Sequence, residues 1–571
     1  MSPALRRWLP FLAWPRPTRA TLAADLRAGL AVGLVLIPQA LAYATLAGMP
    51  AQTGLYAALL PAVVGCLWGS SPLLAAGPVA LTSLLSFGAL QPFAAPGSSG
   101  WVAAAVWLAL YAGLMQCALG ALRLGVIANL VSGPTLAGFI HAAALIIIAT
   151  QLPALLGLPP WGASLSGWPA QVAARLQQAP GAVAVSAAFG LGALLLLLWL
   201  RRHRPHWPGV LLVCGLGIVL SHFSAYAGHG GAVIGSVPEA LPQLSLPPAL
   251  DFGTHRALLA PALVVALVSF TEAMSSARTL ARRRGERWNE NQELIGQGLA
   301  KIASAASGAF PVSGSFSRSA LNEYAGARTA WSTLFAAACV FAFLLAGTAV
   351  LAPLPQAVLA AVVIVPVTGL LNVAGLRRIG RLARDDGLVA LITFAATLFA
   401  VPQLHWGVLA GLIAGLAASM LRRSQPRIVE LGVLPDGRLR ARERYGLPRP
   451  APDLIVLRPD TALVYASAAA VERAVLDHVD AGVQRVLLVG TAINDLDVTG
   501  LDTLRELRRT LAARGTTLYL CRMKLPVWRL LERAGVPAEF GENRCFRTER
   551  QAIAALTGEN PAPAAADRPH P

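Results

Sequence analysis

Glu272 lies inside a long apolar stretch of the sequence, in the segment SFTEAMSSA. Burying a carboxyl there is costly, so such a residue usually serves a function. It can bind a proton, ligate sodium or pair with an arginine, and Ser276 follows one helical turn later on the same face. We expect Glu272 and Ser276 to form a proton or sodium site. The alternative is an internal salt bridge that holds helices together.

Arg318 lies at the start of a short helix-like segment, in SGSFSRSA. A guanidinium group can hold an oxyanion through two parallel hydrogen bonds, and Ser317 and its neighbouring serines add hydroxyl and backbone donors. The pattern therefore predicts an anion-binding residue. The alternative is a counter-charge for Glu323 or Glu272, and the two roles are compatible.

Two segments are too short to cross a bilayer as ordinary helices. One follows Gly77-Pro78, and the other follows Phe310-Pro311. A half-helix leaves backbone N–H groups unpaired at its N-terminus, where the helix dipole adds about half a positive charge. Two such ends that face each other make an anion site. Ordinary Gly/Pro kinks are the alternative. Gln39 and Tyr43 lie one turn apart beside Pro38. They are expected either to face an internal cavity or to pack against neighbouring helices.

The elements that position these residues are expected to lie in a membrane. The chain of 571 residues is 56% hydrophobic and 13% charged, with a mean hydropathy of +0.60. No Asp, Glu, Lys or Arg occurs between Arg27 and Arg123, or between Arg123 and Arg175. A soluble surface cannot avoid charge for so long, whereas a lipid-facing surface must.

The net charge of +18 does not indicate nucleic-acid binding, because the arginines cluster at the ends of apolar segments. This distribution is typical of cytoplasmic loops, and it predicts an even number of spans with both termini in the cytoplasm. The clusters are Arg6, Arg7, Arg16 and Arg19; Arg201, Arg202 and Arg204; Arg282, Arg283 and Arg284; Arg377, Arg378, Arg381 and Arg384; and Arg422, Arg423 and Arg427.

Apolar runs predict a helical membrane region over 22–423, after a cytoplasmic segment at 1–21. The break at Gly133-Pro134 leaves open whether 125–156 holds one kinked helix or two shorter ones. If it holds one kinked helix, the membrane region has about 14 helices. The expected helices cover 22–42, 52–69, 79–90, 101–121, 125–135, 137–156, 181–200, 207–224, 257–280, 292–307, 317–326, 330–352, 355–373, 386–400 and 404–421.

A polar linker is expected over 424–452, followed by a small cytoplasmic α/β domain over 453–550 and a disordered tail over 551–571. Thr499, in the turn DVTG, is expected to cap a helix of that domain. The six cysteines have no metal-binding spacing. No nucleophile–base pair or nucleotide loop occurs, so we expect no enzyme and no cofactor.

Two long segments resemble the sulfate permease (SulP) family of anion transporters. They are LIPQALAYATLAGMPAQTGLYAALLPAVVGCLWGSSPLLAAGPVALTSLL at 36–85 and NQELIGQGLAKIASAASGAFPVSGSFSRSALNEYAGARTAWS at 291–332. The region 452–541 is similar to a STAS domain. The resemblance implies about 14 spans in a 7+7 inverted repeat, with uracil-permease-like core and gate domains, in a homodimer.

The resemblance also implies roles for residues at matching motif positions. Substrate would contact the first helix and the two half-helix ends, and Glu272 with Ser276 would couple a cation. Sodium-coupled relatives tend to carry Asp at the position of Glu272, so the Glu of this chain favours coupling to a proton. Thr499 stands where free STAS proteins are phosphorylated. The implied substrate-binding residues are Gln39, Tyr43, Val79, Ala80, Ser317 and Arg318.

The leading hypothesis is a proton-coupled symporter of a sulfate-like oxyanion or a dicarboxylate, with an elevator-like movement, in a bacterial inner membrane. A sodium-coupled bicarbonate symporter or an anion exchanger is the alternative within transport. A membrane-anchored STAS signalling protein is the alternative of another class. The sequence does not identify the anion.

Overall fold

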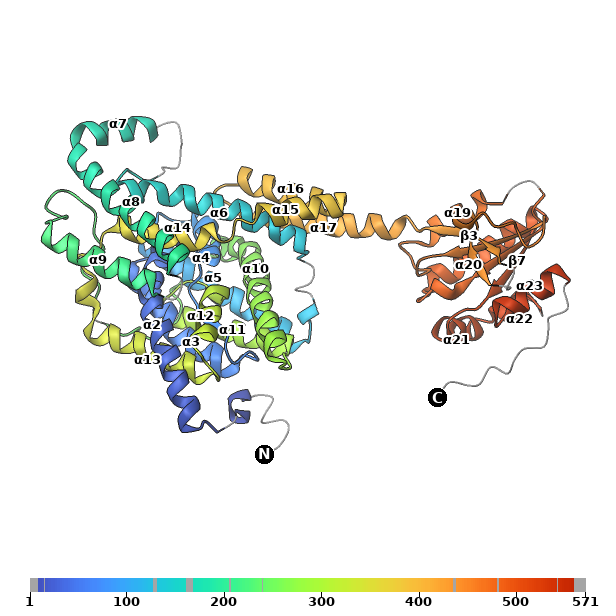
Figure 1. Ribbon diagram of the computed structural model, residues 1–571, viewed down its shortest axis with the longest axis horizontal. Coiled ribbons are helices and arrows are strands. Elements are labelled where there is room, and N and C mark those ends of the chain that lie inside the picture. Colours follow the sequence, from blue (N-terminus) through green and yellow to red (C-terminus); the bar gives the residue numbers. More distant parts are fainter. Residues whose placement is uncertain are drawn as a thin grey trace. The chain divides into compact units, whose positions relative to one another are not determined.

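The computed structural model describes residues 9–558, apart from 15, 127–130, 161–167, 205, 206, 239, 435–437, 480, 481 and 542. The chain divides into two compact units, Met1–Gly415 and Leu416–Pro571 (Figure 1). The first unit is helical apart from two very short strands, and the second is built on a sheet.

The first unit contains long apolar helices that begin and end close to the predicted spans. Eight helices of the described residues are long and apolar enough to cross a membrane, and three shorter apolar helices accompany them. The elements are η1 (Pro10–Ala13), α2 (Arg19–Leu46), α3 (Ala51–Trp68), β1 (Ala75–Gly77), α4 (Ala80–Leu90), α5 (Ser99–Ala121), α6 (Gly133–Leu156), α7 (Trp168–Gln178), α8 (Pro180–His203), α9 (Gly209–Phe223), α10 (Phe252–Arg284), α11 (Glu290–Ala306), β2 (Ser313–Ser315), α12 (Phe316–Tyr324), α13 (Trp331–Ala346), η3 (Thr348–Leu351), α14 (Gln356–Thr368), α15 (Val373–Leu382), α16 (Arg384–Phe399) and α17 (His405–Ser424).

The helices from α2 to α9 correspond in order to those from α10 to α17. The contacts between elements follow the same correspondence: α5 packs on α11 as α13 packs on α3, and α2 packs on α13 as α10 packs on α5. Likewise, α6 packs on α16 as α14 packs on α8. This duplication separates a group formed by α2–α5 and α10–α13 from a group formed by α6, α8, α14 and α16.

The two short strands pair with each other where the two halves meet. β1 and β2 are antiparallel, with Ala75 opposite Ser315 and Gly77 opposite Ser313. Each strand leads directly into a short helix, α4 or α12. The backbone of these strands is not helical, so its N–H and C=O groups need partners outside a helix. The pairing supplies these hydrogen bonds in an apolar environment that holds no water to form them.

The structure decides between the two possibilities that the sequence leaves open around Gly133-Pro134. One helix, α6, begins at Gly133, because Pro134 fits the first helical turn; residues 127–130 lie outside the described part. The expected helices do not include the short amphipathic helices α7 and α15, since neither is long or apolar enough to span.

Helices α5 and α11 approach closely because glycine lines their contact. A Cβ atom on Gly113 would lie 2.7 Å from the carbonyl oxygen of Gly298, and one on Gly120 would lie 2.7 Å from that of Asn291. Small residues allow this approach in membranes, where packing replaces the hydrophobic effect as the driving force.

We predict that Gly113→Leu destabilises the first unit by about 1–3 kcal/mol, because the new side chain overpacks the contact between α5 and α11. Gly192→Leu is the matched control, since a Cβ there meets no heavy atom within 4 Å. The melting temperatures of the two purified variants in detergent check this. Equal melting temperatures would contradict the packing described.

The second unit contains a six-stranded sheet in the order β4-β3-β5-β6-β7-β8. Strands β5 to β8 are parallel, and β3 pairs antiparallel with β4 and β5. Apolar side chains are buried on both faces of the sheet, under α19–α21 on one face and α23 on the other. The strands are β3 (Ile428–Val433), β4 (Leu439–Ala441), β5 (Leu454–Pro459), β6 (Arg485–Val489), β7 (Thr517–Cys521) and β8 (Cys545–Phe546), and the helices are α18 (Arg442–Tyr445), α19 (Ala468–Asp477), η4 (Gly490–Ala492), α20 (Val498–Ala513), α21 (Leu525–Arg533), α22 (Val536–Phe540) and α23 (Glu549–Thr557).

Two expected boundaries of this unit are wrong. The segment 424–452 was expected to be a linker, but its residues form β3 and β4, which extend the sheet. The tail was expected to start at 551, but α23 continues to Thr557 because Ala552, Ile553 and Leu556 are buried against the sheet. Residues 559–571 lie outside the described part.

An ion pair joins the starts of two neighbouring strands. Asp453, just before β5, accepts hydrogen bonds from Nε and Nη2 of Arg485 at 2.8 and 2.5 Å. These bonds from Arg485 lower the pKa of the Asp453 carboxyl below its usual value. A carboxyl whose pKa is lower in the folded than in the unfolded state stabilises the fold at any pH above its unfolded-state pKa. This stabilisation is lost as the pH falls through the lower, folded-state pKa.

We therefore predict that Asp453→Asn destabilises the second unit at pH 7, because the carboxylate of Asp453 is lost. The difference from the unsubstituted protein should shrink below pH 4 and disappear once Asp453 is protonated. Hydrogen exchange of the β5 and β6 amides in the full chain, measured at several pH values, checks this. A difference that is independent of pH would argue against the ion pair.

Candidate functional site

A cavity of about 540 Å³ lies in the first unit, between the junctions of β1–α4 and β2–α12 and the helices α8, α9 and α14. One wall carries polar and charged side chains from α2, α10 and the two junctions. The other wall is largely apolar. Residues of the first wall are Val35, Gln39, Tyr43, Val79, Ala80, Leu81, Glu272, Ser315, Phe316, Ser317 and Arg318; residues of the second include Leu197, Leu200, Arg201, Arg204, Trp207, Val210, Val365 and Leu370.

Both short helices begin at this cavity. Val79 is the N-cap residue of α4, and no side chain there accepts a hydrogen bond from the first turn. Ser315 caps α12 by accepting a bond from the backbone N–H of Arg318 at 3.3 Å. The N-termini of α4 and α12 therefore present N–H groups and the positive ends of two helix dipoles to one space.

The guanidinium group of Arg318 joins the two junctions. Its Nη1 donates to the carbonyl oxygen of Pro78 at 2.6 Å, and the residue is 2% exposed. A Cβ atom on Gly77 would lie 3.2 Å from Nη2, so a glycine lets the guanidinium approach this backbone. Nε and Nη2 are buried and have no partner among the described residues. Buried donors without a partner are rare in proteins, so these two atoms call for a ligand or another acceptor.

Neither of the expected counter-charges forms an ion pair with Arg318 in the described structure. Glu323 accepts a hydrogen bond from Arg283 at 3.1 Å instead. Glu272 lines the same cavity as Arg318, but its Oε2 is buried and has no partner among the described groups.

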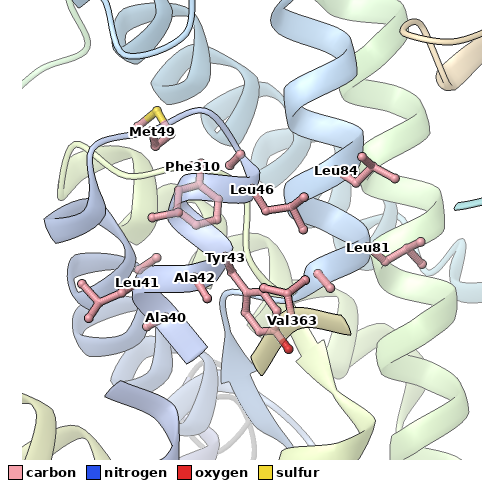
Figure 2. Packing of buried hydrophobic residues seen from close by; sticks show 14 of the residues in the cluster. Ala40, Leu41, Ala42, Tyr43, Leu46, Met49, Leu81, Leu84, Phe310 and Val363 are labelled. Carbon is pink, nitrogen blue, oxygen red and sulfur yellow. The ribbon is translucent and has the colours of Figure 1, made fainter. Parts of the chain in front are cut away.

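Gln39 and Tyr43 line the cavity from α2, which favours the first of the two roles that their spacing allows. The Oε1 atom of Gln39 is buried and unpartnered within the described part of the chain. Tyr43 is 5% exposed and belongs to the buried cluster that also holds Leu81 and Val363 (Figure 2). The helix therefore contributes one amide and one phenol to the polar wall of the cavity.

The structure does not bring Ser276 into the cavity. Its hydroxyl donates to the carbonyl oxygen of Glu272 at 3.3 Å along the same helix, and Ser276 is not among the lining residues. The cavity thus holds seven of the eight expected membrane-site residues, which are Gln39, Tyr43, Val79, Ala80, Glu272, Ser317 and Arg318. Their roles in binding and coupling remain predictions.

Sequence reasoning missed three basic residues in or near this site. Arg201 and Arg204 line the opposite wall, and Arg201 donates to the carbonyl oxygen of Val365 at 2.9 Å. They were assigned to a loop, because their position beside α14 depends on tertiary packing. Lys301 in α11 is fully buried. The rule that identified Glu272, a charge within an apolar helix, also applies to Lys301.

In the second unit, Thr499 is exposed in the first turn of α20. The expected capping role is wrong, since Asp497 is the N-cap and accepts a bond from the Gly500 N–H at 2.8 Å. Hydrogen bonds from the backbone of Gly500 and Tyr465 lower the pKa of Asp497. The hydroxyl of Thr499 is left accessible, and its phosphorylation remains a prediction.

The arrangement in the membrane unit suits an oxyanion and a proton. The donors are a guanidinium, helix N-termini, an amide and a serine hydroxyl, and the acceptor of a proton is the Glu272 carboxyl. Within the described residues, no group of three His, Cys, Asp or Glu side chains lies together as a metal site.

Comparison with known proteins gives two matching family models. The model of the sulfate permease family matches residues 22–393, and that of the STAS domain matches residues 448–552. A probable sulfate transporter of Mycobacterium tuberculosis is 33% identical over 546 residues, which cover 94% of this chain and 96% of the relative. A sodium-independent sulfate anion transporter of Bos taurus is 31% identical over 563 residues, with 92% and 88% covered.

Two solved structures share the fold. The murine Slc26a9 anion transporter in the inward-facing state gives a TM-score of 0.86 at 20% identity, covering 98% of this chain and 96% of that one. The transmembrane domain of the cyanobacterial bicarbonate transporter BicA gives a TM-score of 0.58 at 23% identity, covering 70% of this chain and 99% of that one.

Proposed function

We propose that this chain, which belongs to the sulfate permease family and is a multi-pass membrane anion transporter, carries a small oxyanion such as sulfate together with a proton. The observation that carries the proposal is the guanidinium of Arg318. It is held by Pro78 between two helix N-termini at the cavity, with Nε and Nη2 unpartnered among the described residues.

The donor set favours a compact oxyanion over an organic ligand. Arg318, the N-terminus of α4 and the Ser317 hydroxyl all line the cavity, and each can bond a negatively charged oxygen. The relatives in Mycobacterium tuberculosis and Bos taurus carry names of sulfate transporters, which agrees with this class of substrate.

Proton coupling is supported by the position of Glu272. Its carboxyl lies in the same cavity as Arg318, and Oε2 has no partner within the described residues. A carboxyl so placed can carry a proton together with the anion. Protonation removes a negative charge that repels the substrate.

An elevator-like movement is supported by the division of the cavity walls. The predicted binding residues belong to the group formed by α2–α5 and α10–α13. The facing wall of α8, α9 and α14 offers mainly apolar side chains such as Leu197, Val210 and Val365. Apart from Arg201 and Arg204, this wall offers no charged group to the ligand among the described residues, so the first group could move with its ligand past it.

We predict that Arg318→Ala weakens sulfate binding by about tenfold or more, because a buried charge-assisted hydrogen bond contributes ~1.5–3 kcal/mol. Isothermal titration of the purified protein with sulfate measures this. Arg283→Ala, which removes an exposed arginine paired with Glu323, is the control and should bind as the unsubstituted protein does. Unchanged affinity in Arg318→Ala would remove this residue from the site.

We predict that Glu272→Gln abolishes the acceleration of sulfate uptake by an inward proton gradient, because the amide cannot carry the proton. Uptake into proteoliposomes with an imposed pH gradient measures this, and Glu286→Gln, in the loop after α10, is the control. If the gradient still accelerates Glu272→Gln, Glu272 is not the coupling group. Uptake that needs sodium, or an anion on the opposite side, would instead identify a sodium symporter or an exchanger.

A further inference from the structure

Lys301 is a fully buried cation that the proposed function does not use. It lies in the middle of α11 with no exposed surface and is not among the residues that line the cavity. An ammonium group at membrane depth is costly unless its charge is balanced or used. Its position therefore calls for an electrostatic role.

A chain of hydrogen bonds holds Lys301 beside the helix that carries Glu272. Its Nζ donates to Oε1 of Gln116 in α5 at 3.0 Å. Nε2 of Gln116 donates in turn to the carbonyl oxygen of Ala266 at 2.7 Å and to Oγ of Ser269 at 3.2 Å. Ser269 lies three residues before Glu272 on α10, so the ammonium is fixed near the carboxyl without touching the cavity.

The charges around this network are few. Glu272 interacts electrostatically with both Arg318 and Lys301. Cys117 of α5 is the other titratable neighbour of Lys301. The other elements packed on α11, which are α3 and β2, contain no charged residue. Glu293, two turns earlier on α11, is bonded to the backbone of Ser70 and Ser71.

Arg201 and Arg204 lie on the facing wall of the cavity, so the wall that carries Glu272 is considered by itself. Its three charges give this wall two states. With Glu272 deprotonated, Arg318, Lys301 and Glu272 sum to one positive charge. With Glu272 protonated, they sum to two positive charges, which balance a divalent anion. In a medium of low dielectric constant such a balance governs which ligand charge is bound.

We propose that Lys301 supplies a second fixed positive charge behind the wall that carries Arg318 and Glu272, and so selects a divalent oxyanion, which is loaded with one proton on Glu272. This inference rests on the proposed function, since it requires that the cavity binds an anion. Lys301 acts through its charge and does not touch the substrate, so it is a specificity-determining residue.

The test compares the affinities of purified full-length protein for sulfate and for nitrate, a monovalent oxyanion, by isothermal titration. In Lys301→Gln the sulfate affinity should fall by about tenfold relative to the nitrate affinity, because a lost charge weakens a divalent ligand more than a monovalent one. Lys301→Arg should keep the original ratio.

An unchanged ratio in Lys301→Gln, or an equal loss of both affinities, would overturn the proposal. If the unsubstituted protein binds neither anion, the proposed function fails instead. If Lys301→Gln does not fold, the ratio is followed from pH 6 to pH 10 in the Glu272→Gln protein. The ratio should fall as Lys301 loses its proton, and a constant ratio would overturn the proposal.

Discussion

A helix that is broken inside a bilayer must satisfy its backbone without water, and this constraint shapes the centre of the molecule. The break at Gly77-Pro78 lies between β1 and α4, and the break at Phe310-Pro311 comes just before β2. The backbones of β1 and β2 are hydrogen-bonded to each other. Arg318 bonds the carbonyl oxygen of Pro78, which the break leaves without a helical partner. The same group that completes the backbone of one half therefore brings positive charge to the cavity.

The internal duplication gives the two groups of helices two different kinds of contact. The glycine contact between α5 and α11 holds one group of helices tightly, because backbone meets backbone at Gly113 and Gly298. Across the cavity, the wall formed by α8, α9 and α14 is mainly apolar. Close packing within a group and nonspecific contact between groups are the conditions for rigid-body movement.

Much of the fold and of the site was predictable from the sequence, and the misses have physical causes. Absence of charge located the membrane helices, and the cost of burial singled out Glu272 and Arg318. Ser276 follows Glu272 by one turn, yet spacing does not tell whether a hydroxyl faces a cavity or its own helix. Arg201 reaches the cavity through packing of α8 on α14, which no local pattern reveals. The strands at 428–441 were missed because arginines and prolines around them resemble a linker.

The uncommitted donors of Arg318 have a consequence for the empty protein. Without an anion, Nε and Nη2 lie in a buried space with no described partner, beside two helix N-termini of the same sign. Burying donors without a partner costs free energy, and an anion that accepts their hydrogen bonds removes that cost. Anion binding should therefore raise the stability of the first unit, because the ligand binds the folded arrangement and not the unfolded chain.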